Sequence, residues 1–345
     1  MAGSTVSVPN VDALRNRSRE KLAYLLSMIP GDKDLILDPD LILPLDRLAG
    51  ASFLKKCGIG KIHKLDPQVA VEPKQRVYIL RPTLEKTKVI CDHINSHKSQ
   101  NKRLARVDVV FLPRKLYVCE ELFEYEGVYG DVNLISLDLG FIPLDRDILS
   151  LELPNYYSDF FVNKNYIWIQ TVANSLVELQ KEFGFIPNVY GQGLGAKLVY
   201  DMMQRMLTSA NVKHGLRDRE IGHLFLIDRD VDHASTLLTQ LTYEGQLDEI
   251  FSIKCGYIAL GSEVTGKSDP VKLSLTSEDK LFDEIRDSHI TKAFDILSKK
   301  VKELVQSAEK RQNMNVSDMR AYIKTDLTRH QQHHGSVALR KKTFD

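Results

Sequence analysis

Charged side chains follow an apolar run at residues 221–227, which predicts a buried strand. The run Asp228-Arg229-Asp230 stands directly after it, with Asp232 beyond, at a strand end where open α/β sheets usually place their sites. Carboxylates grouped in this way could hold a hard cation such as magnesium. The arginine among them favours internal ion pairing instead. A structural role through internal pairing is therefore the preferred interpretation, and a metal or catalytic site is the alternative.

Residues 261–268 match the phosphate-binding pattern G-x-x-x-x-G-K-S. Its fixed positions are Gly261, Gly266, Lys267 and Ser268. A working loop needs a strand before it and a helix that begins at the Lys-Ser pair, so that free backbone amides and the helix dipole meet the phosphates. Residues 271–275 instead alternate between apolar and polar, which predicts a hairpin. A flexible turn is the simpler interpretation, and a P-loop nucleotide-binding protein is the alternative function.

Residues 191–196, GQGLGA, match the dinucleotide-binding pattern G-x-G-x-x-A, and Asp218 stands at about the distance of a ribose-binding acid. The strand before the motif is short and Asp218 lies in a charged loop, so a tight strand-to-helix turn is preferred. His330, His333 and His334 could bind a transition metal, but no cysteine or second histidine cluster completes such a site. The sequence therefore predicts no cofactor, no metal and no catalytic residue.

Composition limits the classes of partner. The chain has 345 residues, of which 43% are hydrophobic, so two or three domains with substantial cores are expected. Its 47 basic and 46 acidic residues provide no net field for nucleic acid or an anionic membrane. A basic run at residues 98–106 is interpreted as a solvated connection, with an anionic-lipid contact as the lesser alternative. The four cysteines lack CxxC spacing, which indicates a reducing compartment. No stretch approaches the ~18 to 20 apolar residues of a membrane span, so any membrane role is peripheral.

Alternating strand and helix patterns in residues 1–150 predict an α/β fold with a doubly wound parallel sheet, covered by helices on both faces. The strand candidates are residues 34–37, 61–65, 76–80, 107–112 and 133–137. The helical patterns cover residues 18–28, 44–57, 84–94 and 116–124. A second α/β unit begins near residue 154, with helices at 167–183 and 196–207 and strands at 188–191 and 221–227.

The chain becomes helical beyond Pro270. Apolar residues recur at steps of four and three residues between Ile290 and Ala308, which predicts one long amphipathic helix. A shorter amphipathic segment at residues 319–327 precedes a polar tail at 330–345. Both apolar stripes need a surface to pack against, within this chain or on a partner.

Three blocks of sequence resemble the Sec/Munc (SM) family of SNARE-fusion chaperones. They are residues 221–251, residues 141–154 (FIPLDRDILSLELP) and residues 273–290, in the family's order. The amino-acid sequence at residues 228–232 and 253–256 is most similar to that of the B-type members of the vacuolar protein sorting class C branch. Many relatives carry Thr-Pro-Leu and a histidine where this chain has residues 235–237 (STL) and Gln240.

The resemblance implies three regions: SM-like domain 1 at residues 1–150, the first half of domain 2 at 151–268, and the start of a helical domain 3 with a polar tail at 269–345. SM proteins are longer, so the chain resembles a C-terminally shortened product or an incomplete gene model. The family pattern implies that Asp228, Arg229 and Asp232 fix a strand-to-helix corner and an interface between domains. Tyr243 and Glu244 are expected to pack nearby.

The same resemblance implies a function in binding, without an enzymatic step. SM proteins hold a syntaxin-like helix or an assembling four-helix SNARE bundle during vesicle docking and fusion. For this branch, the implied setting is cytoplasmic and peripheral on late endosomes and lysosomes, reached through partners. The implied partners are endosomal and lysosomal SNAREs and a class C scaffold subunit of the Vps-sixteen or Spe-thirty-nine type. Nucleic acid is not among them.

Overall fold

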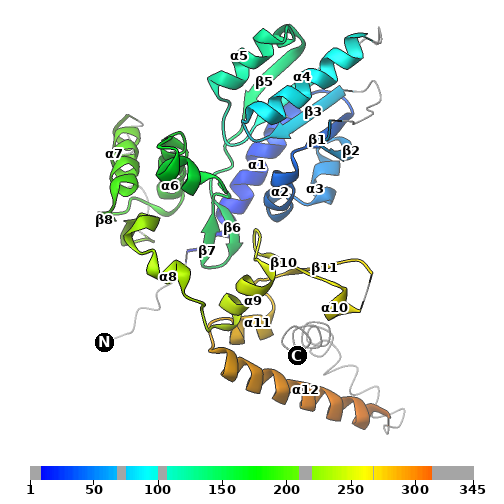
Figure 1. The fold of residues 1–345 in the computed structure, drawn as a ribbon, viewed down its shortest axis with the longest axis vertical. Coiled ribbons are helices and arrows are strands. Elements are labelled where there is room, and N and C mark those ends of the chain that lie inside the picture. The colour runs from blue at the N-terminus through cyan, green and yellow to red at the C-terminus, as the bar shows by residue number, and fades with distance from the viewer. Residues whose placement is uncertain (1–8, 68–74, 100–106, 210–219, 267, 313–345) are drawn as a thin grey trace. The chain divides into compact units, whose positions relative to one another are not determined.

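The computed structural model describes residues 9–67, 75–99, 107–209, 220–266 and 268–312 (Figure 1). The chain forms two compact units, residues 1–231 and 232–345, and each is described by itself. Among the described residues, no helix is long and apolar enough to cross a membrane.

The first unit contains a five-stranded parallel sheet in the order β2-β1-β3-β4-β5. Its strands are β1 (Lys33–Leu37), β2 (Ile59–Lys64), β3 (Gln75–Leu80), β4 (Val107–Phe111) and β5 (Val132–Ser136). Every residue of β1 and β4 is buried, as expected for parallel strands covered on both faces. The predicted doubly wound sheet and its five strands are confirmed.

Helices cover both faces of this sheet. The elements α1 (Asp12–Met28), α2 (Ile42–Leu48) and α3 (Ala51–Lys56) contribute to the hydrophobic core on one face. The elements α4 (Leu84–Ser99) and α5 (Tyr117–Tyr125) contribute to the core on the other face. Apolar side chains of alternate strand positions fill the two cores, because successive residues of a strand point to opposite faces.

Two helix predictions in this region were wrong in their bounds. The single helix predicted at residues 44–57 is two helices, because Ala49 and Gly50 are extended, with ψ of 91° and 168°. Glycine inside a helix costs about 1 kcal/mol, and Gly50 serves instead as the N-cap of α3. The first helix begins at Asp12, six residues before the predicted start at Ser18. Ser18 lies on its buried side, with its hydroxyl 2.9 Å and 2.7 Å from the carbonyl oxygens of Leu14 and Leu139.

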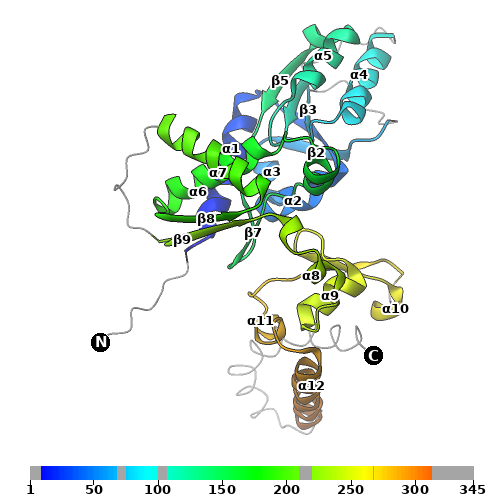
Figure 2. The same ribbon diagram turned by 60° about the vertical axis from the view of Figure 1, so that its left-hand side comes forward.

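The second part of this unit follows a short hairpin of β6 (Ile142–Asp145) and β7 (Ile148–Ser150). It consists of α6 (Ile169–Phe183), β8 (Asn188–Gln192), α7 (Leu194–Ser209) and β9 (His223–Ile227). The predicted elements at residues 167–183, 188–191, 196–207 and 221–227 are confirmed. The two strands pair in parallel, and α6 and α7 lie on one side of them (Figure 2).

The prediction that residues 221–227 form a buried strand was wrong. Leu224 and Leu226 pack toward the core formed with α6 and α7. The alternate residues Phe225 and Ile227 are 64% and 67% exposed, and the ring of Phe225 stacks on that of Tyr190 with centroids 5.0 Å apart. A two-stranded sheet with helices on one side buries only alternate residues, although the sequence reads as a continuous apolar run.

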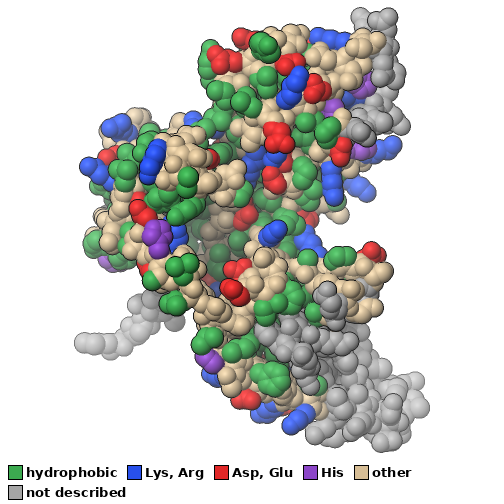
Figure 3. All heavy atoms as spheres, in the orientation of Figure 1, with side chains coloured by type: hydrophobic (Ala, Val, Ile, Leu, Met, Phe, Trp, Pro, Cys, Tyr) green, Lys and Arg blue, Asp and Glu red, His purple; other side chains and the backbone are tan. Residues whose placement is uncertain are grey.

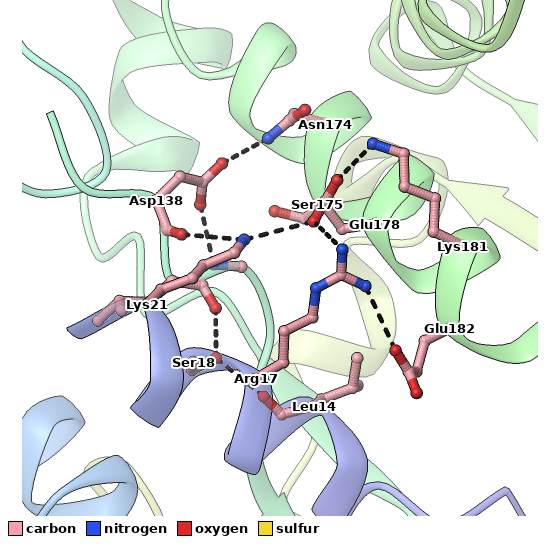
Figure 4. A network of polar contacts seen from close by, with 12 residues as sticks. Leu14, Arg17, Ser18, Lys21, Asp138, Asn174, Ser175, Glu178, Lys181 and Glu182 are labelled. Atoms are coloured by element: carbon pink, nitrogen blue, oxygen red, sulfur yellow. Dashed lines mark hydrogen bonds and ion pairs between the residues drawn. The ribbon is translucent and has the colours of Figure 1, made fainter. Parts of the chain in front are cut away.

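Helix α1 joins the two parts of the first unit. Leu22 and Leu26 belong to the core of the five-stranded sheet, whereas Leu14 belongs to the core of α6 and α7. A network of charged groups connects α1 to α6 (Figure 4). Within it, the carboxylate of Glu178 lies 3.1 Å from Arg17 and 3.3 Å from Lys21.

We expect Glu178→Gln to lower the free energy of unfolding of this unit by about 1 to 2 kcal/mol at neutral pH. Burial alone would raise the pKa of Glu178. The hydrogen bond from Lys181 and the charges of Lys21 and Arg17 outweigh burial and hold the pKa below its ordinary 4.5. Since the folded pKa is the lower one, this stabilisation is present above about pH 4.5 and lost as pH falls through the folded value.

Urea unfolding at several pH values, followed by the fluorescence of Trp168, measures this effect. Trp168 is the single tryptophan, and it is 9% exposed in the turn before α6. The difference between wild type and Glu178→Gln should shrink as the solution is acidified. Glu182→Gln is the matched control, because the Glu182 carboxylate lies 3.3 Å from Arg17, away from the centre of the network. A pH-independent difference for Glu178→Gln would contradict the role assigned to its charge.

The second unit is built on one hydrophobic core. Its elements are α8 (Ala234–Leu237), α9 (Tyr243–Phe251), β10 (Tyr257–Leu260), α10 (Ser262–Thr265), β11 (Val271–Ser274), α11 (Lys280–Ile285) and α12 (Ile290–Gln312). The predicted long helix is confirmed as α12, which buries Ala293 and Leu297 in the core while Phe294 is 42% exposed. The segment predicted at residues 319–327 and the tail at 330–345 lie outside the described residues.

Candidate functional site

The carboxylate of Asp228 lies at the N-terminus of α7. Its Oδ2 accepts a hydrogen bond from the amide of Gly195 and its Oδ1 accepts one from the amide of Ala196, each at 2.7 Å. The first amides of a helix have no intrahelical partner, and the helix dipole favours a negative charge there. A side chain of the protein therefore occupies the place that a phosphate takes in a nucleotide-binding G-x-G-x-x-A loop.

Two glycines of the GQGLGA motif make room for Asp228. A Cβ atom on Gly193, whose φ is +109°, would lie 2.3 Å from Cγ of Asp228. A Cβ atom on Gly195 would lie 2.9 Å from Oδ1 of the same carboxylate. The glycine spacing that resembles a dinucleotide motif is thus explained by an internal contact. Asp218, the candidate ribose-binding acid, lies outside the described residues.

An apolar pocket of about 480 Å³ opens beside Asp228, within the range of small-ligand pockets. The segment 150–157 forms one side, and residues of α6, α7 and β9 form the other. Asp228 and Arg229 line its polar end. Burial, followed by the charge of Asp228, raises the pKa of Tyr156 above its ordinary 10. Both oxygens of Asp228 accept amide hydrogen bonds from the chain itself, and the lining is largely apolar, so this site suits the binding of apolar groups.

The other residues of the predicted signature occupy different surroundings. Arg229 and Asp230 are exposed, in the first unit. In the second unit, Asp232 accepts hydrogen bonds from the amide of Ser235 at 3.0 Å and from its hydroxyl. Across the described ranges, no group of three His, Cys, Asp or Glu side chains is placed to hold a metal ion.

Tyr243 and Glu244 belong to the first turn of α9. Tyr243 is fully buried in the core of the second unit. The carboxylate of Glu244 lies 3.5 Å from the guanidinium of Arg286, and its amide donates to the Arg286 carbonyl oxygen at 3.1 Å. Thr242 caps the helix by accepting from the Gly245 amide at 3.2 Å. Each residue of this Thr-Tyr-Glu-Gly segment therefore has an internal contact that holds α9 in place.

The segment that matches a P-loop closes a hairpin, as predicted. β10 and β11 pair antiparallel, with Leu260 opposite Val271. The short α10 ends before Gly266, and β11 begins at Val271, so no helix begins after Lys267-Ser268 in the described residues. Lys267 itself lies outside those residues. The alternative of a P-loop nucleotide-binding protein is not supported, because such a loop needs a helix whose first amides face the phosphates.

A second candidate position is the point where the strand order of the parallel sheet reverses, between β1 and β3, which is where ligands bind in many open α/β sheets. Asp38, at the end of β1, is fully buried. Its carboxylate accepts hydrogen bonds from the amide of Arg81 at 3.0 Å and from Nζ of Lys86 at 2.7 Å. The Arg81 guanidinium donates to the carbonyl oxygen of Glu152. The chain's own charges fill this position. Sequence reasoning missed it because Asp38 is 43 residues from Arg81 and 48 from Lys86.

The comparison with protein-family models identifies the family to which this fold belongs. A model of the Sec1 family matches residues 33–341, and the chain belongs to that family. The predicted SM resemblance is thereby confirmed.

Within the family, the chain is 37% identical over 333 residues to vacuolar protein sorting-associated protein 33B of Mus musculus. This match covers 96% of this chain and 54% of that protein. It is 31% identical to the vacuolar protein-sorting-associated protein 33 homolog of Arabidopsis thaliana, over 93% of this chain and 56% of that protein. The chain thus spans about half the length of these relatives, 54% and 56%. The predicted similarity to the B-type members of the branch is confirmed.

Solved structures agree on the fold. The Unc18–syntaxin 1 complex from Monosiga brevicollis matches with a TM-score of 0.60 and 18% identity, over 96% of this chain and 62% of the matched chain. The SM protein Vps45 in complex with the Qa SNARE Tlg2 matches with a TM-score of 0.61 and 16% identity, over 96% and 60%. At these identities the match shows a shared architecture.

Proposed function

We propose that this chain binds SNARE proteins and acts as an SM-type chaperone in vesicle docking and fusion. The observation that carries the proposal is the 37% identity to vacuolar protein sorting-associated protein 33B over 96% of the chain. Two SM proteins of the same fold are solved with a syntaxin or a Qa SNARE. Side chains of the protein, Asp228 and Asp38, occupy the two positions where a nucleotide could bind. This occupation supports a binding function rather than a catalytic one.

The finer proposal places this activity at late endosomes and lysosomes. The partners we propose are a syntaxin-like SNARE helix or four-helix bundle and a class C scaffold subunit that brings the chain to the membrane. Residues 1–150, 151–268 and 269–345 are proposed to be SM domain 1, the first half of domain 2 and the start of domain 3. The signature residues Asp228, Arg229, Asp232, Tyr243 and Glu244 are proposed to be structural.

The physical task is to hold helices in register. A SNARE helix presents apolar side chains at a spacing of three and four residues, which requires apolar surface with a polar rim. The buried strands of the first unit form a rigid base, and the apolar pocket beside Asp228 has the matching chemistry. Binding of this kind lowers the entropy cost of bundle assembly and disfavours wrong pairs, without a covalent step.

The test is direct binding between the purified chain and the helical domain of an endosomal Qa SNARE, measured by calorimetry with and without Mg-ATP. We expect binding that is indifferent to ATP and unchanged in Lys267→Ala. The control partner is the same SNARE domain with serine at its apolar heptad positions, which should not bind. ATP affinity that disappears in Lys267→Ala, together with no SNARE binding, would overturn the proposal.

A further inference from the structure

One edge of the five-stranded sheet carries a group of lysines, which we call the lysine edge: Lys55, Lys56, Lys61 and Lys64, with Ile62 among them. Residues 51–65 contain these four lysines and one histidine but no aspartate or glutamate. All four lysines are exposed, and Ile62 is 42% exposed. In a chain with 47 basic and 46 acidic residues, this is a local concentration of positive charge.

A bulge in β2 gathers these side chains. Strand β2 pairs with β1 at Lys33↔Ile59 and then at Leu35↔Ile62, so β2 has one extra residue there. The carboxylate of Asp34 accepts a hydrogen bond from the amide of Lys61 at 3.0 Å. A Cβ atom on Gly60 would lie 3.1 Å from that carboxylate. The bulge is therefore held from inside the sheet.

The bulge decides on which face of the sheet Ile62 and Lys64 lie. Beyond it, Ile62 and Lys64 pair with Leu35 and Leu37, which face the core covered by α3. Lys55 and Lys56 lie in the last turn of α3, which packs against β2. Without the extra residue, Ile62 and Lys64 would fall on the opposite face of the sheet. Figure 3 shows blue side chains gathered beside the edge that α3 and β2 form in Figure 1.

Three of these ammonium groups, those of Lys55, Lys56 and Lys64, keep their full charge. Considering the described residues alone, none of Lys55, Lys56 and Lys64 forms an ion pair. By contrast, Lys88 on α4 lies 2.8 Å from Glu126 and Lys115 lies 2.6 Å from Glu120. Lys55, Lys56 and Lys64 therefore keep their charge, whereas Lys88 and Lys115 are paired.

We propose that the lysine edge is a contact surface for anionic membranes. Lysine is a point charge on a flexible stem, which suits the diffuse field of lipid headgroups. Ile62, in the middle, adds one apolar side chain at the depth of the headgroups. A helical protein partner would need several apolar side chains beside the charges, and within residues 51–65 Ile62 is the one large apolar side chain that is exposed.

Protection of the sheet edge against pairing with another strand explains only two of the four lysines. Lysines on an edge strand prevent pairing with a second chain, and Lys61 and Lys64 lie on β2, an edge strand. Lys55 and Lys56 lie on α3, where no strand can pair. The surface goes beyond the proposed SNARE binding, because it adds direct lipid contact to recruitment by partners.

The test is co-sedimentation of the whole chain with vesicles of phosphatidylcholine alone or of phosphatidylcholine with phosphatidylserine. We expect binding to the anionic vesicles alone, weakened by salt. Each lysine near such a surface raises partitioning about five-fold, so the double variant Lys55→Gln/Lys64→Gln should bind about 25-fold more weakly. The variant with all four lysines changed should not bind.

The matched control changes four exposed lysines of the second unit to glutamine: Lys280, Lys292, Lys299 and Lys302. It has the same net charge as the four-lysine edge variant, and it should retain vesicle binding. Absence of wild-type binding to the anionic vesicles would overturn the proposal, as would an equal loss in the control. SNARE binding is measured in parallel on every variant, since loss of SNARE binding with intact vesicle binding would assign the edge to a protein partner instead.

Discussion

Gly193→Ala is expected to destabilise the first unit by about 3 to 5 kcal/mol. The φ of Gly193 is +109°, a conformation that alanine adopts only with strain, and the new Cβ would lie 2.3 Å from Cγ of Asp228. In the native chain the carboxylate of Asp228 accepts hydrogen bonds from the amides of Gly195 and Ala196, each at 2.7 Å. To relieve the clash, the carboxylate must move away and lose both hydrogen bonds. The strand-to-helix corner and the rim of the apolar pocket would be lost together.

Denaturant unfolding followed by Trp168 fluorescence measures this loss in the first unit. The matched control is Gly222→Ala, at the entrance to β9, where an added Cβ meets nothing within 4 Å. We expect the control to differ from wild type by less than about 0.5 kcal/mol. If Gly193→Ala unfolds at the same denaturant concentration as Gly222→Ala, Asp228 does not occupy the corner as described.

Asp38→Ala is expected to cost about 3 to 5 kcal/mol, because it removes the fully buried carboxylate that stabilises the buried Arg81 and the partly buried Lys86. Asp38 is fully buried and accepts from the amide of Arg81 and from Nζ of Lys86. Burial alone lowers the pKa of Lys86, but the hydrogen bonds that Lys86 donates to Asp38 and Asp40 outweigh burial and raise the pKa above 10.5. Since the folded pKa is the higher one, this stabilisation is present below pH 10.5 and lost as pH rises through the folded value.

Asp40→Ala is the matched control for Asp38→Ala. Its carboxylate also contacts Nζ of Lys86, but its side chain is 60% exposed whereas that of Asp38 is fully buried. We expect the Asp40 variant to lose at most about 1 kcal/mol, because an exposed pair is screened by water. Unfolding of both variants at pH 7, again followed by Trp168, separates the two effects. Equal losses would show that burial of Asp38 does not set its contribution.

Local patterns in the sequence predicted most of the elements. Most strands of the parallel sheet are short apolar runs, and each covering helix has its own 3.6-residue period, so both can be recognised without knowing their neighbours. The long helix α12 was predicted in the same way, from apolar residues beginning at Ile290. The P-loop match was assigned to a hairpin because residues 271–275 alternate, which is again a local signal.

Two of the failures share one physical cause, which is that burial depends on what covers an element. Residues 223–227 have the composition of a buried strand, yet helices lie on one side of β9 and leave Phe225 and Ile227 exposed. The early start of α1 was missed because it depends on Leu14, which packs in the core formed with α6 and α7. The break at Ala49-Gly50 is explained instead by a local property, the low helix propensity of glycine.

By itself, the sequence determined the family, the doubly wound sheet and the hairpin at residues 261–268, because short-range periodicity and motif order carry that information. The tertiary structure alone decided what the candidate sites do. It brought Asp228 to Gly193, 35 positions earlier in the sequence, and Asp38 to Lys86, 48 positions later. It also turned Ile62 and Lys64 to the face of α3 through a single bulge. Such contacts depend on strand order and register, which join residues that no local pattern relates.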